Sequence, residues 1–385
     1  PGTAGTTYLF VINSFLAGGA ERSLLEFLPR LAASGVRPVV VCLRQGLVGF
    51  EDELFAQGWD VRVLTGRGRM GVIRALRRLM REIRPALVYT ALFDADLAGR
   101  LASIGLDIPV VTNLVNTAYD PARAADPNVD ARKLALVRMI DGFTARHFTN
   151  HFHAISEAVK QSTVETMGVP ADRITVVLRG RDPDRLGTPS PGRTAAARTA
   201  LGLSAAHQVV VAVGRQEYQK GHRHLVDAVG LMAGSHPDAV LTIAGRKGNA
   251  TAALEAQIER LGLGGRVRLL GHRGDVAEVL AAADVFAFPS LYEGLGGALI
   301  EAMALGLPIV ASDLAALREV VHPGENADLV PPADPAALAQ ALSALLNDEP
   351  RRGEYGARSR ELFDQGFNGA AAAEALVTLL ARIAH

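Results

Sequence analysis

Short apolar runs alternate with amphipathic helical segments along the chain, and this alternation is the first guide to the fold. The runs 8–12, 38–43, 61–64, 86–89 and 109–112 are predicted strands in the first half, and 209–213, 239–244, 267–270, 285–288 and 308–311 in the second. Helical segments lie between them, such as 20–33, 222–233 and 276–283. In 20–33, Leu24, Leu28 and Leu31 share one face. Alternation of this kind predicts parallel sheets with crossover helices.

The pattern stops once and then restarts, which predicts two domains. A polar stretch rich in Arg, Pro, Gly and Thr begins at Arg179 and marks the break. We expect an α/β protein with two Rossmann-like, doubly wound parallel-sheet domains facing a cleft. The predicted boundaries are 1–180 for the N-terminal domain, 181–206 for a linker, 207–365 for the C-terminal domain and 366–385 for a final helix. Ligands are expected beyond the carboxyl ends of the strands.

Composition narrows the setting of the protein. The chain has 385 residues, and 40 basic residues balance 40 acidic ones, which argues against nucleic acid as the main partner. Only four of the basic residues are lysines, a hint of a GC-rich bacterial genome. The single cysteine, Cys42, lies in an apolar run and is predicted to be a buried strand residue. The absence of a long apolar span or a signal-peptide pattern predicts a cytoplasmic protein, with contact at the inner face of a membrane left open.

Two glutamates bracket a glycine-rich turn, and this is the most informative stretch. It reads Glu293-Gly294-Leu295-Gly296-Gly297-Ala298-Leu299-Ile300-Glu301, between a predicted strand and a predicted helix over 298–305. Amides at a helix N-terminus attract anions, and glycine allows close approach to the backbone. Phosphate alone would be repelled by the two carboxylates, whereas sugar hydroxyls donate hydrogen bonds to them. The combination fits a nucleotide-sugar.

A second motif, Gly214-Arg215-Gln216-Glu217-Tyr218-Gln219-Lys220-Gly221, follows the first strand of the second domain. Arginine can clamp a diphosphate with its planar fork and lysine as a point charge. Taken by itself, the same motif also fits a basic surface loop.

The segment from Phe288-Pro289-Ser290 to Ile309-Val310-Ala311-Ser312, together with the Gly-Arg and Lys-Gly pairs upstream, resembles the signature of retaining glycosyltransferases of the glycogen-synthase-like group, family four, which have the two-domain GT-B fold. The resemblance implies that the N-terminal domain is the acceptor side and that the C-terminal domain binds a nucleoside-diphosphate sugar donor. It places Arg215 and Lys220 on the pyrophosphate, Glu293 near the reacting carbon and Glu301 at the ribose. It also implies donor contacts from Gly18, Gly19, Gly214, His272, Gly294, Leu295, Gly296 and Gly297, a last helix that crosses back to the first domain, and no bound metal or other cofactor.

The chain departs from the family pattern at two places. Where many members carry a histidine after a first-domain strand, this chain has Asn113 and Asn116, which cannot take up a proton. Where the family has Asn-Gly-x-Asp, this chain has Arg179-Gly180-Arg181-Asp182. These four residues, Asn113, Asn116, Arg179 and Arg181, are candidate acceptor or sugar contacts. The alternative interpretation is that the two arginines are linker side chains exposed to water.

The sequence therefore predicts a retaining, metal-independent glycosyltransferase with Glu293, Arg215 and Lys220 as its catalytic residues. The acceptor is a hydroxyl on a carbohydrate, a lipid-linked molecule or a small molecule. Two alternatives stay open: a nucleotide-sugar epimerase on the same fold, and a degenerate nucleotide-sugar-binding protein. Asp94-Ala95-Asp96 resembles a metal-binding Asp-x-Asp motif. Its place at the start of a predicted helix favours the interpretation that these acids stabilise the helix N-terminus.

One predicted helix is both basic and amphipathic. Arg74, Arg77, Arg78, Arg81 and Arg84 line one side of it, and Ile73, Leu76, Met80 and Ile83 line the other. Such a helix either lies on an anionic membrane or packs its apolar side on the sheet. Packing on the sheet is the favoured interpretation.

Overall fold

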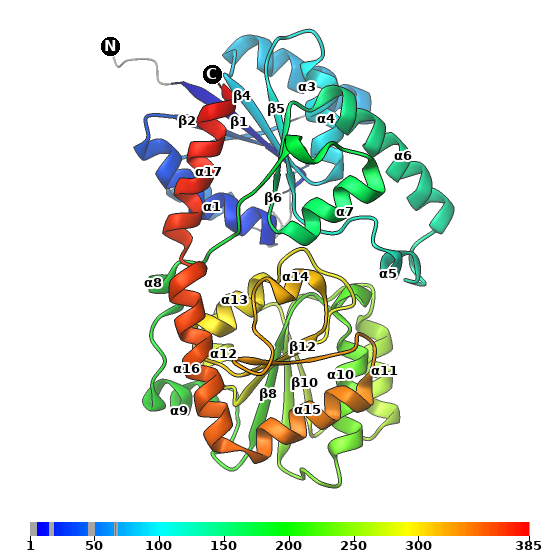
Figure 1. Ribbon diagram of the computed structural model, residues 1–385, viewed down its shortest axis with the longest axis vertical. Coiled ribbons are helices and arrows are strands. Elements are labelled where there is room, and N and C mark those ends of the chain that lie inside the picture. Colours follow the sequence, from blue (N-terminus) through cyan, green and yellow to red (C-terminus); the bar gives the residue numbers. More distant parts are fainter. Residues whose placement is uncertain (1–5, 15–18, 45–50, 65, 67, 385) are drawn as a thin grey trace. The chain divides into compact units, whose positions relative to one another are not determined.

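The computed structural model describes residues 6–14, 19–44, 51–64, 66 and 68–384, and the chain divides into two compact units (Figure 1). Unit 1 comprises Pro1–Tyr119, Asp130–Gly180 and Gly369–His385. Unit 2 comprises Asp120–Val129 and Arg181–Asn368. The segment 181–206, interpreted above as a linker, is thus part of unit 2, and the final helix groups with unit 1.

Unit 1 contains a parallel sheet with the strand order β3-β2-β1-β4-β5-β6-β7. Its strands are β1 (Thr7–Ile12), β2 (Arg37–Cys42), β3 (Asp60–Val63), β4 (Leu87–Ala91), β5 (Val110–Leu114), β6 (His151–Ala154) and β7 (Ile174–Val176). Its helices are α1 (Gly19–Ala33), α2 (Glu51–Ala56), α3 (Gly68–Ile83), α4 (Phe93–Ser103), α6 (Ala131–Phe148), α7 (Glu157–Met167) and α17 (Gly369–Ala384), with the short helix η1 (Ala171–Arg173).

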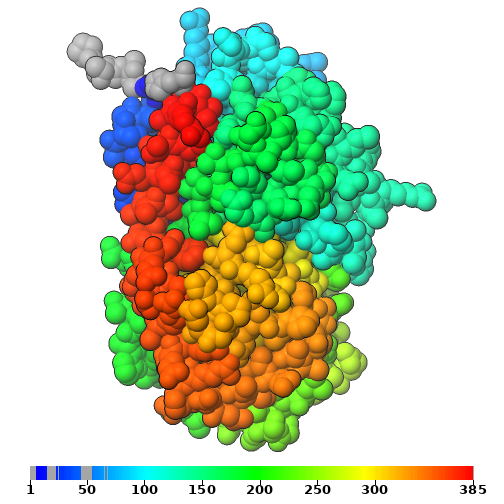
Figure 2. Space-filling view, viewed as in Figure 1, coloured from blue at the N-terminus to red at the C-terminus, as the bar shows by residue number. Residues whose placement is uncertain are grey.

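Both faces of this sheet are covered, which explains why its strands appear as continuous apolar runs. One face packs Phe10 and Tyr89 against Leu28 of α1 and Leu376 of α17. The helices α1 and α17 lie side by side, and the red atoms of α17 border the blue atoms of α1 in Figure 2. The other face packs against α3 and α4.

Unit 2 contains a parallel sheet with the order β10-β9-β8-β11-β12-β13. Its strands are β8 (Gln208–Val213), β9 (Ala239–Ala244), β10 (Val267–Gly271), β11 (Val285–Phe288), β12 (Ile309–Ser312) and β13 (Ala327–Val330). Its helices are α5 (Pro121–Ala124), α8 (Pro183–Leu186), α9 (Pro191–Ala200), α10 (His222–Met232), α11 (Thr251–Arg260), α12 (Val276–Ala281), α13 (Gly297–Ala304), α14 (Ala315–Arg318), α15 (Pro335–Asn347) and α16 (Glu349–Gly366), with η2 (Tyr218–Lys220).

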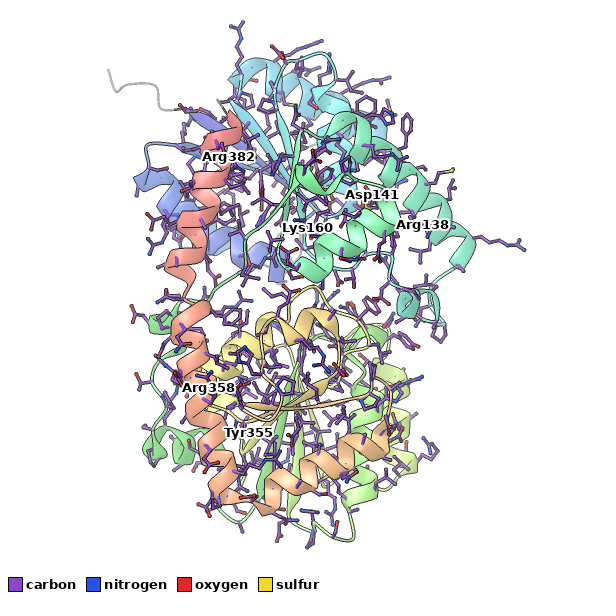
Figure 3. The ribbon with its side chains drawn as sticks, viewed as in Figure 1. Arg138, Asp141, Lys160, Tyr355, Arg358 and Arg382 are labelled. Carbon is purple, nitrogen blue, oxygen red and sulfur yellow. The ribbon has the colours of Figure 1, made fainter. Side chains whose placement is uncertain are left out.

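Helix α16 is tied to the sheet of unit 2 by a polar cluster at β13. Arg351 donates to Asp328 at 2.6 Å and to the hydroxyl of Tyr355 at 2.7 Å, and Tyr355 lies on α16 as labelled in Figure 3. The strand order of the sheet changes direction between β8 and β11, which pair directly. This junction is the switch point at which open α/β sheets bind ligands.

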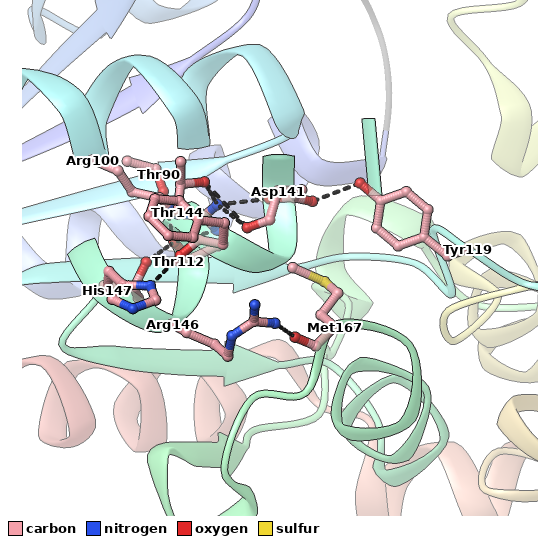
Figure 4. A network of polar contacts seen from close by, with 11 residues as sticks. Thr90, Arg100, Thr112, Tyr119, Asp141, Thr144, Arg146, His147 and Met167 are labelled. Atoms are coloured by element: carbon pink, nitrogen blue, oxygen red, sulfur yellow. Dashed lines mark hydrogen bonds and ion pairs between the residues drawn. The ribbon is translucent and has the colours of Figure 1, made fainter. Parts of the chain in front are cut away.

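Unit 1 also contains a buried polar network around Arg100, whose side chain is 1% exposed (Figure 4). Its Nη1 donates to Asp141 Oδ1 at 2.6 Å and to Thr144 Oγ1 at 3.1 Å. The other carboxylate oxygen of Asp141 accepts a hydrogen bond from the hydroxyl of Tyr119 at 2.7 Å. The charge of Arg100 is therefore matched inside the unit, as a buried cation requires.

Most strand predictions are confirmed with ends shifted by a residue or two, and Cys42 is buried in β2 as predicted. Strands β6, β7 and β13 were not predicted from the sequence. The apolar side of the basic helix α3 is packed on the sheet, because Leu76 and Met80 are fully buried. Among the described residues, no helix has the length and hydrophobicity to cross a bilayer, and no three His, Cys, Asp or Glu side chains are grouped to share a metal ion.

Candidate active site

The loops that follow β8 and β11 are joined to each other at the switch point of unit 2. The amide of Leu291 donates to the carbonyl of Gln219 at 2.7 Å. The side chain of Gln219 donates in turn to the carbonyl of Tyr292 at 2.9 Å. These two contacts hold the Arg215–Lys220 loop and the Glu293 loop, 73 residues apart in sequence, as one rigid element.

Glycine allows these loops to meet backbone to backbone. Gly221 has φ 60°, and a Cβ built there would lie well inside 3.0 Å of the carbonyl oxygen of Pro289. Gly245, after β9, abuts the carbonyl of Gly214 in the same way. Because larger side chains would separate the strands' connecting loops at these points, glycine sets the geometry of the site.

Lys220 and Glu293 form an ion pair, which places the two central predicted residues in direct contact. The methylene groups of Lys220 pass over Gly214, and its Nζ lies 5.2 Å from the ring centroid of Phe288. Glu293 Oε1 also accepts a hydrogen bond from Ser290 Oγ at 3.1 Å. The side chain of Lys220 is 17% exposed and that of Glu293 is 8% exposed. The pair is therefore largely shielded from water, and Lys220 is the more exposed partner.

Arg215 lies at the open edge of the same loop. Its Nη1 donates to Glu217 at 2.6 Å, and its side chain is 41% exposed. An ion pair this exposed is weak, so the guanidinium can exchange Glu217 for a phosphate at small cost.

The helix α13 begins in the glycine-rich turn. Its N-cap, Gly296, has φ 88° and makes no side-chain cap hydrogen bond, and its carbonyl accepts from the amides of Leu299 and Ile300. The guanidinium of Arg181 packs directly over Gly297, where a Cβ would collide with it.

Arg181 is buried, not solvated. Its Nε donates to Glu301 Oε1 at 2.9 Å, with side chains 4% and 10% exposed. Of the two interpretations of this arginine, solvation in a linker is wrong. Glu301, predicted to face a ribose, is held by a cation that the sequence did not connect to it.

Two further buried side chains shape the chemistry of the loops. Burial, and then the neighbouring charge of Lys220, lowers the pKa of His222 to about 3, so this histidine is neutral at neutral pH. Burial raises the pKa of Tyr292 to about 12, so its phenol stays protonated and can donate. Neither group can serve as a general acid or base near pH 7.

The remaining predicted donor residues lie at different places. His272 follows β10 and is exposed. Gly19 is the first residue of α1, and Gly18 lies outside the described residues.

The predicted first-domain contacts lie in unit 1. Asn113 is 6% exposed and lines a cavity of about 40 Å³ with Tyr89, His153 and Arg179. Its Oδ1 has no hydrogen-bond partner among the described residues, and a cavity of this size can hold a water molecule there. Asn116 is half-buried, and its Oδ1 accepts the amide of Thr117 at 2.9 Å.

Sequence reasoning missed Ser290, Gln219 and the Arg181–Glu301 pair. Ser290 and Gln219 lie inside motifs that were recognised, so their position was visible but their hydrogen bonds were not. The partners in the Arg181–Glu301 pair lie 120 residues apart, and no local pattern connects them.

Comparison with known proteins agrees with this architecture. Residues 17–185 match the family model described as Glycosyltransferase Family 4, and residues 207–348 match the one described as Glycosyl transferases group 1. A D-inositol 3-phosphate glycosyltransferase of Xylanimonas cellulosilytica is 31% identical over 97% of this chain and 91% of its own length. The enzyme of the same name from Corynebacterium kroppenstedtii is 32% identical over 59% of this chain, and the match spans about half of that relative's length.

The structural comparison covers both units. The crystal structure of Anabaena HepE in complex with UDP-glucose matches with a TM-score of 0.87 and 25% identity, over 98% of this chain and 99% of that one. Two parallel-sheet α/β units with such neighbours define the GT-B fold. The chain belongs to the family-four glycosyltransferases.

Proposed function

We propose that the chain is a retaining glycosyltransferase that moves a sugar from a nucleoside-diphosphate sugar to an acceptor hydroxyl. The observation that carries the proposal is the contact of Lys220 with Glu293 at the switch point of unit 2. A cation and a carboxylate at one place suit a ligand that combines phosphates with sugar hydroxyls.

Lys220 resolves the conflict between a carboxylate and a diphosphate. Its ammonium group has three N–H donors, so it can donate one hydrogen bond to Glu293 and the others to phosphate oxygens. Arg215 adds a planar fork, and the uncapped N-terminus of α13 adds amides. These groups stabilise the charge that develops on the leaving diphosphate, which is the principal electrostatic demand of the reaction.

Glu293 takes the sugar in this proposal. Its oxygens accept hydrogen bonds from sugar hydroxyls, and Ser290 and Lys220 fix its orientation. A carboxylate beside the anomeric carbon also favours a transition state with positive charge on the sugar ring. The pKa values of His222 and Tyr292 keep both groups from acting as a base near pH 7, and the leaving phosphate is assigned to take the acceptor proton.

Glu301 and Arg181 are assigned to the nucleoside end. Arg181 engages one oxygen of Glu301, and the carboxylate retains the capacity to accept from a ribose hydroxyl. The cationic groups above provide the leaving-group stabilisation that a divalent ion would otherwise supply, so we propose metal-independent transfer. The solved relative holds UDP-glucose, which makes UDP-hexoses the first donors to test.

The test combines binding and turnover. UDP, ADP and GDP are screened by thermal shift, because a ligand that binds only the folded form raises the midpoint. The matching nucleotide-sugars are then incubated with and without an acceptor panel, and products are followed by mass spectrometry and by the anomeric coupling constant in NMR. Glu293→Gln is expected to abolish transfer while the variant remains folded at the assay temperature, and Glu255→Gln, at an exposed position on α11, retains full activity.

The outcomes separate the alternatives. Donor converted without any acceptor indicates an epimerase, and nucleotide binding without turnover indicates a degenerate binding protein. Full transfer by Glu293→Gln would refute the assignment of this residue, and inverted product would refute retention.

A further inference from the structure

The outer face of α6 in unit 1 carries a stripe of exposed apolar side chains. Leu136, Met139, Ile140 and Phe143 are 50%, 65%, 39% and 51% exposed. Their spacing of three and four residues puts them on one side of the helix. The buried side of the same helix carries Asp141, Gly142, Thr144 and Ala145 instead. The larger apolar groups of α6 thus face away from the core, the reverse of what packing on a sheet requires.

This apolar stripe is bounded by cations. Arg132 and Lys133 lie in the first turn, four and three residues before Leu136, and Arg146 lies three residues after Phe143. Helix α6 is described over its full length, and its exposed charged residues are all basic: Arg132, Lys133, Arg138 and Arg146. The acid of the helix, Asp141, is turned inward to Arg100, and Arg138 lies farther out along α6 (Figure 3).

The neighbouring helices in the same layer continue this surface. Helix α3 packs on α4, and α4 packs on α6. Helix α3 exposes Arg74, Arg78 and Arg81, and Met70 on it is 58% exposed. Helix α3 contains one acidic residue, Glu82. On its other side α6 packs on α7, which exposes Glu157 and Glu165. The positive charge therefore gathers on α6 and α3, and Figure 2 shows the teal atoms of α6 forming an edge of unit 1.

We propose that this face of unit 1, the α6 stripe with its basic border, docks on an anionic lipid surface. The apolar side chains would enter the boundary between headgroups and acyl chains, and the arginines and Lys133 would meet anionic headgroups. The chemistry disfavours two other occupants. A second copy of the chain would bring two basic borders together, and nucleic acid would leave the apolar stripe in water.

Vesicle co-sedimentation of the full chain tests the proposal, with phosphatidylcholine vesicles compared with vesicles that also contain phosphatidylglycerol. Binding is expected only with phosphatidylglycerol and should weaken with added salt. Met139→Gln/Phe143→Gln should lower the affinity at least about tenfold, because two apolar side chains no longer gain from leaving water. Arg132→Gln/Lys133→Gln should lower it about thirtyfold, since each cation near an anionic surface contributes about fivefold.

Matched controls come from unit 2. Leu231 on α10 is 63% exposed, comparable with Met139, and Leu231→Gln should bind vesicles like the wild type. Arg260→Gln, at the exposed end of α11, controls for the loss of one positive charge. Circular dichroism melting checks that each variant is folded. The assay contains no nucleotide-sugar, so its outcome is independent of the proposed transfer reaction.

Three results would overturn the proposal. The first is no binding of the wild type to vesicles with phosphatidylglycerol. The second is equal loss of binding in Leu231→Gln and Met139→Gln/Phe143→Gln. The third is a wild-type dimer in light scattering that Met139→Gln/Phe143→Gln converts to a monomer, which would assign the stripe to a second copy of the chain.

Discussion

Gly221→Ala should damage the site far more than an ordinary glycine substitution. Gly221 occupies the left-handed region at φ 60°, where a Cβ costs about 1 kcal/mol. The same Cβ would also lie inside 3.0 Å of the backbone oxygen of Pro289, a contact that no side-chain rotation relieves. Forcing the two loops apart adds about 1–3 kcal/mol, as overpacking does, so the expected cost is about 2–4 kcal/mol.

Gly262→Ala is the matched control. Gly262 has φ 66° and follows α11 in the same unit, and a Cβ added there would meet no atom within 4 Å. The substitution therefore carries only the backbone strain, about 1 kcal/mol. The difference in unfolding free energy between the two variants gives the cost of the contact with Pro289.

Urea unfolding measures the two costs. Trp59, the single tryptophan, lies in unit 1, so its fluorescence follows that unit, whereas far-UV circular dichroism follows both. Gly221→Ala should shift the dichroism transition of unit 2, and it should also weaken UDP binding because Lys220 precedes the substituted residue. Equal unfolding free energies for Gly221→Ala and Gly262→Ala would refute the close-packing argument.

Three further predictions concern buried charge. Arg181→Met should destabilise unit 2 by about 3–5 kcal/mol in urea unfolding, because it leaves Glu301 charged and buried. Lys247→Met breaks an exposed pair and should change the free energy of unfolding by less than about 1 kcal/mol. Equal effects of the two variants would contradict the burial argument. Burial raises the pKa of Asp96 to about 7, so the folded form holds a proton that the unfolded form releases. The contribution of Asp96 to the free energy of unfolding should therefore fall between pH 4 and pH 7 by on the order of 3 kcal/mol, a slope opposite in sign to that of His153. Asp96→Asn should remove that slope, and an unchanged slope would reject the assignment. Burial lowers the pKa of His153 to about 4, so its contribution to stability is present above the ordinary histidine pKa and is lost as the pH falls toward 4. In urea unfolding, His153→Gln should therefore lose less stability than the wild type as the pH falls toward 4. An identical loss in the two proteins would contradict the prediction.

The sequence predicted the elements whose physical signal is local. Strands such as 209–213 are buried on both faces and appear as apolar runs, so they were found to within a residue or two. Strand β6 was missed because His151 and His153 interrupt its apolar character, and β13 because Asp328 interrupts it. Strand β7 was missed because it has only three residues.

The site was predictable as far as it follows strand ends. Lys220 and Glu293 lie in motifs that were recognised after β8 and β11, and the structure shows that these two strands pair. The partner of Glu301 was not predictable, because Arg181 reaches it from 120 residues away by tertiary packing. The α6 stripe was missed for a related reason: periodicity shows that a helix has two faces but not which of them the core covers.

The central claim is that the joined loops after β8 and β11 bind the diphosphate of a nucleotide-sugar. Calorimetric titration of UDP, or of whichever nucleoside diphosphate shifts the melting midpoint, into the wild type, Lys220→Gln, Lys220→Gln/Glu293→Gln and Lys247→Gln tests it most directly. Loss of a charge-assisted hydrogen bond predicts at least about tenfold weaker binding for both Lys220 variants. The double variant excludes repulsion by an unpaired Glu293 as the cause, and Lys247, an exposed lysine paired with Glu255, should be dispensable. Equal affinity of the wild type and both Lys220 variants would contradict the claim.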